Sequence, residues 1–173
     1  MVFQFETVYN QKAFTSMAMA LRKTIRKKHS KKSHIFGWIV AVLGIILSFL
    51  GDGDVFVVTF KDIVTYLVVA VIILALVFED KLNGYIAFKR NMKRLNKSVT
   101  VFNDDGYYSE TELGNTQWKY ENINMAVETD DYFVFIFDAS HAQLYDKNSI
   151  SGGSADEFRA LIEEKTGIKT ERI

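Results

Sequence analysis

Two apolar stretches decide the fold of this chain: IFGWIVAVLGIILSFL at residues 35–50 and IVTYLVVAVIILALVF at residues 63–78. Each stretch has sixteen residues, and none of them is charged. As helices with a rise of about 1.5 Å per residue, each would reach roughly 24 Å, slightly short of a hydrocarbon core of about 30 Å. Neighbouring residues close this gap, since the first run is uncharged from residue 33 to residue 51. We therefore predict a helical hairpin that crosses a membrane.

The charges around the hairpin predict its orientation. The formal net charge is +7 over residues 1–34, −2 over 35–78, +4 over 79–97 and −9 over 98–173. Lys and Arg beside membrane spans are retained on the cytoplasmic side, so we expect both termini there and a short acidic outer loop at residues 51–62. A cleaved signal peptide is disfavoured because the apolar run starts far from residue 1 and no small-x-small cleavage site follows it. The other alternative is a buried hairpin in a soluble protein.

The first 34 residues combine a strand with a basic helix. Alternating aromatic residues predict a short strand over residues 2–9. Apolar residues then recur at intervals of three and four from Phe14 to Ile25, which predicts a helix. The opposite face is basic, and its position against a membrane span favours anionic-lipid contact over nucleic-acid binding. The candidate lipid contacts are Arg22, Lys23, Arg26, Lys27, Lys28, Lys31 and Lys32.

The second apolar stretch is predicted to continue as a helix into the cytoplasm over residues 79–98. Its apolar residues follow a heptad-like spacing, at Tyr85, Phe88, Met92, Leu95 and Val99. The N-terminal helix runs in the opposite direction, so the two apolar stripes can face each other in an antiparallel stalk. This arrangement predicts that the strand at residues 2–9 joins the sheet that follows residue 98.

Strands and tight turns alternate from residue 99 onward. The predicted strands cover residues 99–103, 107–111, 116–119, 123–128, 132–138 and 142–145. A final helix begins at the capping box Ser154 to Glu157 and ends at Gly167. The pattern predicts an α+β membrane protein in which the stalk carries a small antiparallel β roll or partly open barrel with a C-terminal helix. The predicted parts are residues 1–34, 35–78, 79–98 and 99–173.

The sequence contains no recognisable pattern of catalytic, cofactor-binding or metal-binding residues. The chain has no cysteine, its three histidines lack metal-ligand spacing, and it has neither a Gly-x-Ser-x-Gly elbow nor a phosphate-binding glycine loop. We therefore predict no enzyme, no cofactor and no small-molecule substrate. The strand at residues 132–138 is apolar on both faces, which suggests either a covered central strand or a partner or oligomer contact. The candidate partner surface is Trp118, Tyr132 and Lys147.

Three segments of the C-terminal region follow one another in a recognisable order: TVFNDDGYYSETELGNTQWKYENINMAVETDDYFVFIF at residues 100–137, AQLYDKNSIS at 142–151 and DEFRALIEEKTG at 156–167. Together with the two membrane helices before them, they resemble the YcxB-like family of bacterial membrane proteins, and this resemblance covers nearly the whole chain. It implies a bacterial inner or plasma membrane location and a cytosolic domain similar to pleckstrin-homology (PH) folds. One departure is Asp146, which precedes Lys147 where the family usually has proline. The matching positions are Phe102, Gly106, Gly114, Trp118, Ile123, Val127, Glu128, Phe133, Lys147 and Phe158.

The leading functional hypothesis is a membrane-anchored adaptor or regulatory protein whose cytosolic domain binds a protein partner, as an accessory to a transporter or an antimicrobial-resistance system. The alternative is a small homo-oligomeric transporter or pore. Ion and substrate paths usually carry charged residues inside the membrane. Residues 35–50 and 63–78 contain none, so the sequence favours the adaptor.

Overall fold

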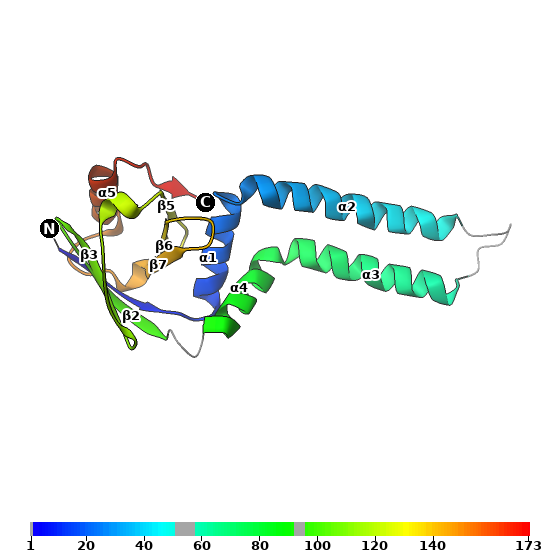
Figure 1. Ribbon diagram of the computed structural model, residues 1–173, viewed down its shortest axis with the longest axis horizontal. Coiled ribbons are helices and arrows are strands. Elements are labelled where there is room, and N and C mark those ends of the chain that lie inside the picture. The colour runs from blue at the N-terminus through cyan, green and yellow to red at the C-terminus, as the bar shows by residue number, and fades with distance from the viewer. Residues whose placement is uncertain (1, 51–57, 92–95) are drawn as a thin grey trace.

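The computed structural model describes residues 2–50, 58–91 and 96–173, and it has a β domain at one end and a long helical hairpin at the other (Figure 1). The helices are α1 (Gln11–Lys23), α2 (Lys27–Phe49), α3 (Phe60–Val77), α4 (Glu79–Asn91) and α5 (Ala155–Thr166), with short 3-10 turns η1 (Tyr120–Asn122) and η2 (Lys147–Ser149). The strands are β1 (Phe3–Val8), β2 (Lys97–Asn103), β3 (Gly106–Thr111), β4 (Gly114–Trp118), β5 (Met125–Glu128), β6 (Tyr132–Ile136), β7 (Ala142–Asp146) and β8 (Glu171–Arg172).

The β domain consists of two four-stranded sheets, in the orders β1-β2-β3-β4 and β7-β6-β5-β8. All neighbours pair antiparallel except β5 and β8, which are parallel. The N-terminal strand β1 pairs with β2 so that Phe3 lies opposite Phe102. The prediction that the first strand joins the C-terminal sheet is therefore confirmed. The mixed α+β class with antiparallel sheets is confirmed as well.

Aromatic side chains fill the space between the two sheets and α5. Phe158 of α5 lies at the centre of this core and is fully buried. Its ring centroid is 4.6 Å from that of Phe5, 4.8 Å from that of Phe102 and 5.0 Å from that of Phe133. Edge-to-face ring pairs of this kind add to the free energy gained by burial. The core therefore joins β1, β2, β6 and α5.

The C-terminal helix begins and ends as its sequence predicts. Ser154 accepts a hydrogen bond from the Glu157 backbone N–H, and the Glu157 carboxylate accepts one from the Ser154 backbone N–H, which confirms the capping box. Gly167 ends the helix in the left-handed conformation with φ 69°. The chain then adds strand β8, which was not predicted because residues 168–173 carry no alternating apolar pattern.

Helix α1 covers the second face of the sheet that contains β6. Phe133 and Phe135 of β6 face the aromatic core, whereas Val134 belongs to a separate apolar cluster with Ala13 and Ala20 of α1. Each of these side chains is at most 1% exposed. Of the alternatives that the sequence left open for this apolar strand, the structure shows a central strand covered on both faces.

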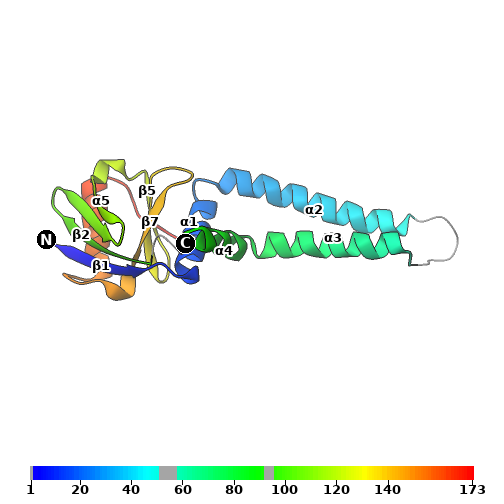
Figure 2. The same ribbon diagram turned by 60° about the horizontal axis from the view of Figure 1, so that its bottom comes forward.

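The stalk differs from its prediction in shape. Helices α1 and α4 lie between the β domain and the hairpin and pack against each other (Figures 1 and 2). The predicted continuous helix is interrupted at Phe78, where φ is −103° and ψ is 22° instead of the helical values near −63° and −42°. A second break at residues 24–26 separates α1 from α2. Met92 and Leu95 of the predicted seam lie outside the described residues, as do residues 51–57 of the predicted outer loop.

Helices α2 and α3 are each long and apolar enough to cross a membrane. Their mean hydropathy reaches 1.7 and 2.4, and only 11% of the residues in each apolar window are buried inside the chain. At about 1.5 Å per residue, the eighteen residues of α3 extend roughly 27 Å. Large apolar side chains project from the pair, among them Phe36 at 69% and Val71 at 64% exposure. The other described residues therefore do not cover α2 and α3 as they would cover the core helices of a soluble protein.

Candidate functional site

The junction between the β domain and the hairpin is held by an ionic network. Arg22 at the end of α1 donates two hydrogen bonds to Asp80 at the start of α4, with Nε–Oδ1 at 2.6 Å and Nη2–Oδ2 at 2.7 Å. The adjacent Glu79 accepts a hydrogen bond from Ser30 Oγ at 3.0 Å and lies 2.7 Å from His34 Nε2. The carboxylate of Asp80 raises the pKa of Arg22 through this hydrogen bond. The network therefore joins α1 and α2 to α4.

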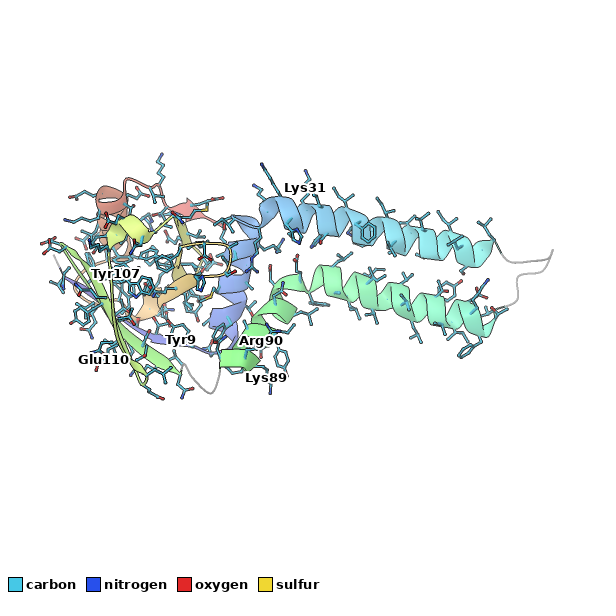
Figure 3. All side chains as sticks on the ribbon, viewed as in Figure 1. Tyr9, Lys31, Lys89, Arg90, Tyr107 and Glu110 are labelled. Carbon is cyan, nitrogen blue, oxygen red and sulfur yellow. The ribbon has the colours of Figure 1, made fainter. Side chains whose placement is uncertain are left out.

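A basic cavity of about 440 Å³ lies beside this network, at the end of α2 nearest to the β domain. Figure 3 shows Lys31 on this part of α2. The cavity also borders the C-terminal strand β8, which contributes Glu171 to its wall. Its lining residues are Arg22, Lys23, Lys27, Ser30, Lys31, His34, Glu171 and Ile173.

The seven predicted lipid contacts separate into three groups in the structure. Arg22 is bound to Asp80, and Arg26 donates from its guanidinium to the backbone carbonyl of Ala139 in the β domain. Arg22 is therefore ion-paired, whereas Arg26 keeps a charge that is unpaired among the described residues but is held by the β domain. The other five form no ion pair within the described part of the chain. Of these, Lys23, Lys27 and Lys31 line the cavity, whereas Lys28 and Lys32 do not; Lys27, Lys28, Lys31 and Lys32 are all exposed.

A second cluster surrounds Glu128, a buried carboxylate at the end of β5 that is 6% exposed. Lys147 Nζ lies 2.7 Å from Glu128 Oε1, and Arg159 Nε of α5 lies 2.6 Å from Oε2. Arg172 Nε of β8 is 3.4 Å from the same Oε2. One carboxylate thus links β5, η2, α5 and β8. A shallow cavity of about 450 Å³ lies over the cluster.

The environment of Glu128 favours its ionised form. Burial alone would raise its pKa, but the hydrogen bonds from Arg159 and Lys147 outweigh burial and lower the pKa to about 2. The same contact raises the pKa of Arg159. Asp130 and Asp156 also line this cavity, so its acidic side chains balance Lys147, Arg159 and Arg172 in number. This balance makes the cluster a structural clamp rather than a site for an anion.

The three residues of the predicted partner surface lie in different environments. Tyr132 is only 4% exposed because it belongs to the apolar cluster beneath α1, so it offers no accessible contact. Lys147 is engaged by Glu128 and also donates to the carbonyl of Thr129. Trp118 is half-buried at the end of β4 and stacks on Phe137 with centroids 4.9 Å apart. The structure therefore brings together no surface from these three, and only Trp118 adjoins an open sheet edge.

Trp118 also lines a cavity of about 300 Å³ between the β domain and the helices α1 and α4, which contribute Phe14 and Asn91 to its wall. Small hydroxyl side chains form much of its wall, including Ser98 of β2, Ser109 of β3 and Thr116 of β4. Trp118 Nε1 is buried and has no hydrogen-bond partner among the described residues. The sequence did not predict this cavity because its hydroxyl side chains come from three separate strands. The one feature that could have predicted the cavity is that Ser98 and Ser109 occupy inward-facing positions of β2 and β3.

The arrangement of titratable groups gives no support for a metal site. Within residues 2–50, 58–91 and 96–173, no three His, Asp or Glu side chains are placed to hold a metal ion. His141 lies 2.7 Å from Asp138 at an exposed turn. This contact lowers the pKa of Asp138, after the larger effect of the Ser140 backbone N–H. The predicted absence of catalytic and cofactor residues stays a prediction.

The comparison with protein families matches residues 102–162 to the family described as YcxB-like protein. The family resemblance is therefore confirmed for this segment, which runs from the end of β2 to the middle of α5. Glu128 of β5 and Lys147 of η2 are two of the positions on which the resemblance rests, and they form a 2.7 Å ion pair with each other. At the departing position, the Asp146 backbone N–H donates to Thr7 Oγ1 at 3.2 Å, a bond that a proline could not donate. No curated protein and no solved structure matched the chain.

Proposed function

We propose that this YcxB-like chain is a bacterial membrane protein whose β domain is a protein-binding module held at the cytosolic surface of the cytoplasmic membrane. In this role it is an adaptor or regulatory subunit and not an enzyme. The exposed apolar surface of α2 and α3 supports insertion into the membrane, because soluble proteins rarely expose an apolar surface of this size to water. The cationic flanks of the hairpin support a topology with both termini in the cytoplasm.

The observation that carries this proposal is the position of α1. Its buried Ala13, Ala20 and Leu21 pack on the sheet that contains β6, and its Arg22 binds the start of α4. Helix α1 is therefore part of both the β domain and the base of the hairpin. A helix shared in this way fixes the orientation of the domain relative to the membrane. Such a fixed orientation suits a module that presents one surface to a neighbouring membrane protein.

The open edge of the first sheet is the part of the β domain that we propose for partner binding. Strand β4 is the last strand in its sheet and has no strand neighbour beyond it among the described residues. Its residues are exposed from Gly114 to Gln117, and the half-buried Trp118 follows. An extended segment of a partner can pair with such an edge through its backbone, while an adjacent aromatic side chain adds specificity. We also propose that the domain is PH-like, which two sheets packed with a C-terminal helix support.

Site-directed photo-crosslinking in the host membrane tests this proposal. A photo-reactive residue at Gln117, which is exposed on β4, should capture one partner protein repeatedly. The same residue at Glu164, exposed on α5, serves as the control and should not capture that protein. Crosslinks to the chain itself alone, or equal capture at both positions, would contradict a partner-binding edge.

The alternative of a homo-oligomeric pore gains no support from the described helices. The polar side chains Ser48 of α2 and Tyr66 of α3 are hydrogen-bonded to each other within one hairpin. Asp62 near the start of α3 accepts from the Thr59 hydroxyl and backbone N–H as part of a capping box. Ser48, Tyr66 and the Oδ2 atom of Asp62 thus have partners inside one chain, whereas the buried Oδ1 atom of Asp62 has none among the described residues.

A further inference from the structure

We propose that the basic cavity at the domain end of α2 is a binding site for one phosphate-bearing anionic group, supplied by the headgroup of an anionic phospholipid. This inference rests on the proposed membrane insertion of α2 and α3. It deepens the earlier expectation of seven lipid contacts by assigning a defined site to three of them, Lys23, Lys27 and Lys31.

The cavity carries more positive than negative side chains. Its three lysines form no ion pair within the described part of the chain, and one carboxylate, Glu171, faces them. The other basic side chains of the wall are already engaged, since Arg22 is bound to Asp80 and His34 contacts Glu79. An excess of positive charge therefore remains in the cavity. Lysine ammonium groups bind phosphate as compact charges with several donors.

The local backbone is the second argument. Lys27 and Lys31 are four residues apart on α2, so they share one helix face. The break at residues 24–26 brings Lys23 from the end of α1 to the same cavity. The first turn of α2 contains no acidic residue, and its N-terminus has no side-chain cap. The partial positive charge of this helix end adds to the three lysines.

The position of the cavity favours a lipid over a soluble anion. Ile35 and Phe36 follow Lys31 by about one helical turn and are 52% and 69% exposed. A phospholipid with its headgroup in the cavity can therefore lay its acyl chains along the apolar surface of α2. A free phosphate would gain nothing from this surface. The depth of the site thus matches the border between headgroups and hydrocarbon.

The test compares two pairs of lysines on the same helix. Lys27→Gln/Lys31→Gln removes two charges from the cavity wall, whereas Lys28→Gln/Lys32→Gln removes two charges outside the cavity, each one position further along α2. The detergent-solubilised full chain is titrated with phosphatidylglycerol, and bound lipid is counted by native mass spectrometry. We expect one tightly bound lipid in the wild type and the control, and affinity about tenfold weaker in the cavity variant. Equal losses of phosphatidylglycerol affinity in both variants would show that the lipid is attracted by the overall positive charge of the region, and this would overturn the site.

Two further arms separate the possible failures. Inorganic phosphate that displaces phosphatidylglycerol at similar concentrations would overturn the lipid as the source of the anion; we expect no such displacement. Phosphatidylcholine bound as tightly as phosphatidylglycerol would overturn an anionic site. Extraction of host membranes at alkaline pH reports insertion separately. A chain that stays in the membrane but does not prefer phosphatidylglycerol contradicts only this inference, whereas a chain that is extracted contradicts the proposed function too.

Discussion

Gly84 of α4 lies directly against the backbone of Thr15 in α1. A Cβ atom at position 84 would be 2.5 Å from Thr15 Cα and 2.7 Å from Thr15 N, closer than real Cβ contacts. These two atoms belong to the backbone of α1 and cannot turn away. The close approach of α1 and α4 at this point therefore requires a residue without a side chain.

Substitution of Gly84 by alanine should separate α1 from α4. Alanine is favoured over glycine in a helix by about 1 kcal/mol, so an unconstrained Gly84→Ala variant would be more stable than the wild type. The clash should reverse this gain, and we expect a net loss of about 1–3 kcal/mol. Thermal unfolding of the full chain in detergent, followed by circular dichroism, measures the change.

Gly37→Ala is the matched control for this experiment. Its new Cβ would lie 3.0 Å from the flexible end of the Leu76 side chain, which can move. We expect its unfolding temperature to stay close to that of the wild type. A Gly84→Ala variant that is as stable as Gly37→Ala would show that the helices are not in close contact.

The sequence predicted the elements that depend on local patterns. Long apolar runs identify α2 and α3, alternation identifies β1, and the spacing of Ser154 and Glu157 identifies the start of α5. Even the addition of β1 to the C-terminal sheet followed from the direction of the helices between them, although its pairing with β2 was not predicted. Each of these predictions depends either on a local sequence pattern or on the order of the elements along the chain.

The sequence did not predict features that depend on contacts between distant residues. The chain breaks at residues 24–26 and at Phe78 without proline or glycine, next to the Arg22–Asp80 pair, whose members are 58 positions apart. Composition likewise could not separate Lys27, which lines the cavity, from Lys28, which does not. The cavity wall includes Glu171 of β8, which is distant from both lysines in the sequence.

The Arg22–Asp80 pair should contribute measurably to the docking of α1. Its two hydrogen bonds are short, and the two side chains are 30% and 19% exposed. A double-mutant cycle with Arg22→Gln and Asp80→Asn should give a coupling of about 1 kcal/mol in unfolding experiments in detergent. The exposed pair Glu6–Lys97 provides the comparison and should show weaker coupling. Equal couplings would argue against a special role for the junction.

Cysteine labelling tests the proposed topology without background, since the chain has no cysteine. Phe60→Cys lies at the start of α3, where the side chain is 81% exposed, and Glu110→Cys lies on the exposed face of β3. In intact cells, a membrane-impermeant maleimide should label Phe60→Cys and not Glu110→Cys. Both should react after permeabilisation. Labelling of Glu110→Cys in intact cells would place the β domain outside.

The Glu128 cluster should make stability depend on pH in the acidic range. A carboxylate whose native pKa is lowered contributes stability that is fully present above its unfolded value of 4.5 and is lost as the pH falls through about 2. The unfolding free energy of Glu128→Gln should therefore fall below that of the wild type by up to about 3 kcal/mol at pH 7. This difference should shrink as the pH approaches 2.

Denaturant titrations of both proteins in detergent at pH 7, 4 and 2.5 measure this difference. Glu110→Gln, on the exposed face of β3 (Figure 3), controls for the loss of a carboxylate elsewhere in the domain. We expect this control to match the wild type at all three pH values, because its side chain has no comparable set of cationic partners within the described part of the chain. A Glu128→Gln deficit of constant size from pH 7 to 2.5 would mean that the lost contacts are not electrostatic. The clamp would then depend on packing of Arg159 against β5 instead of on the charge of Glu128.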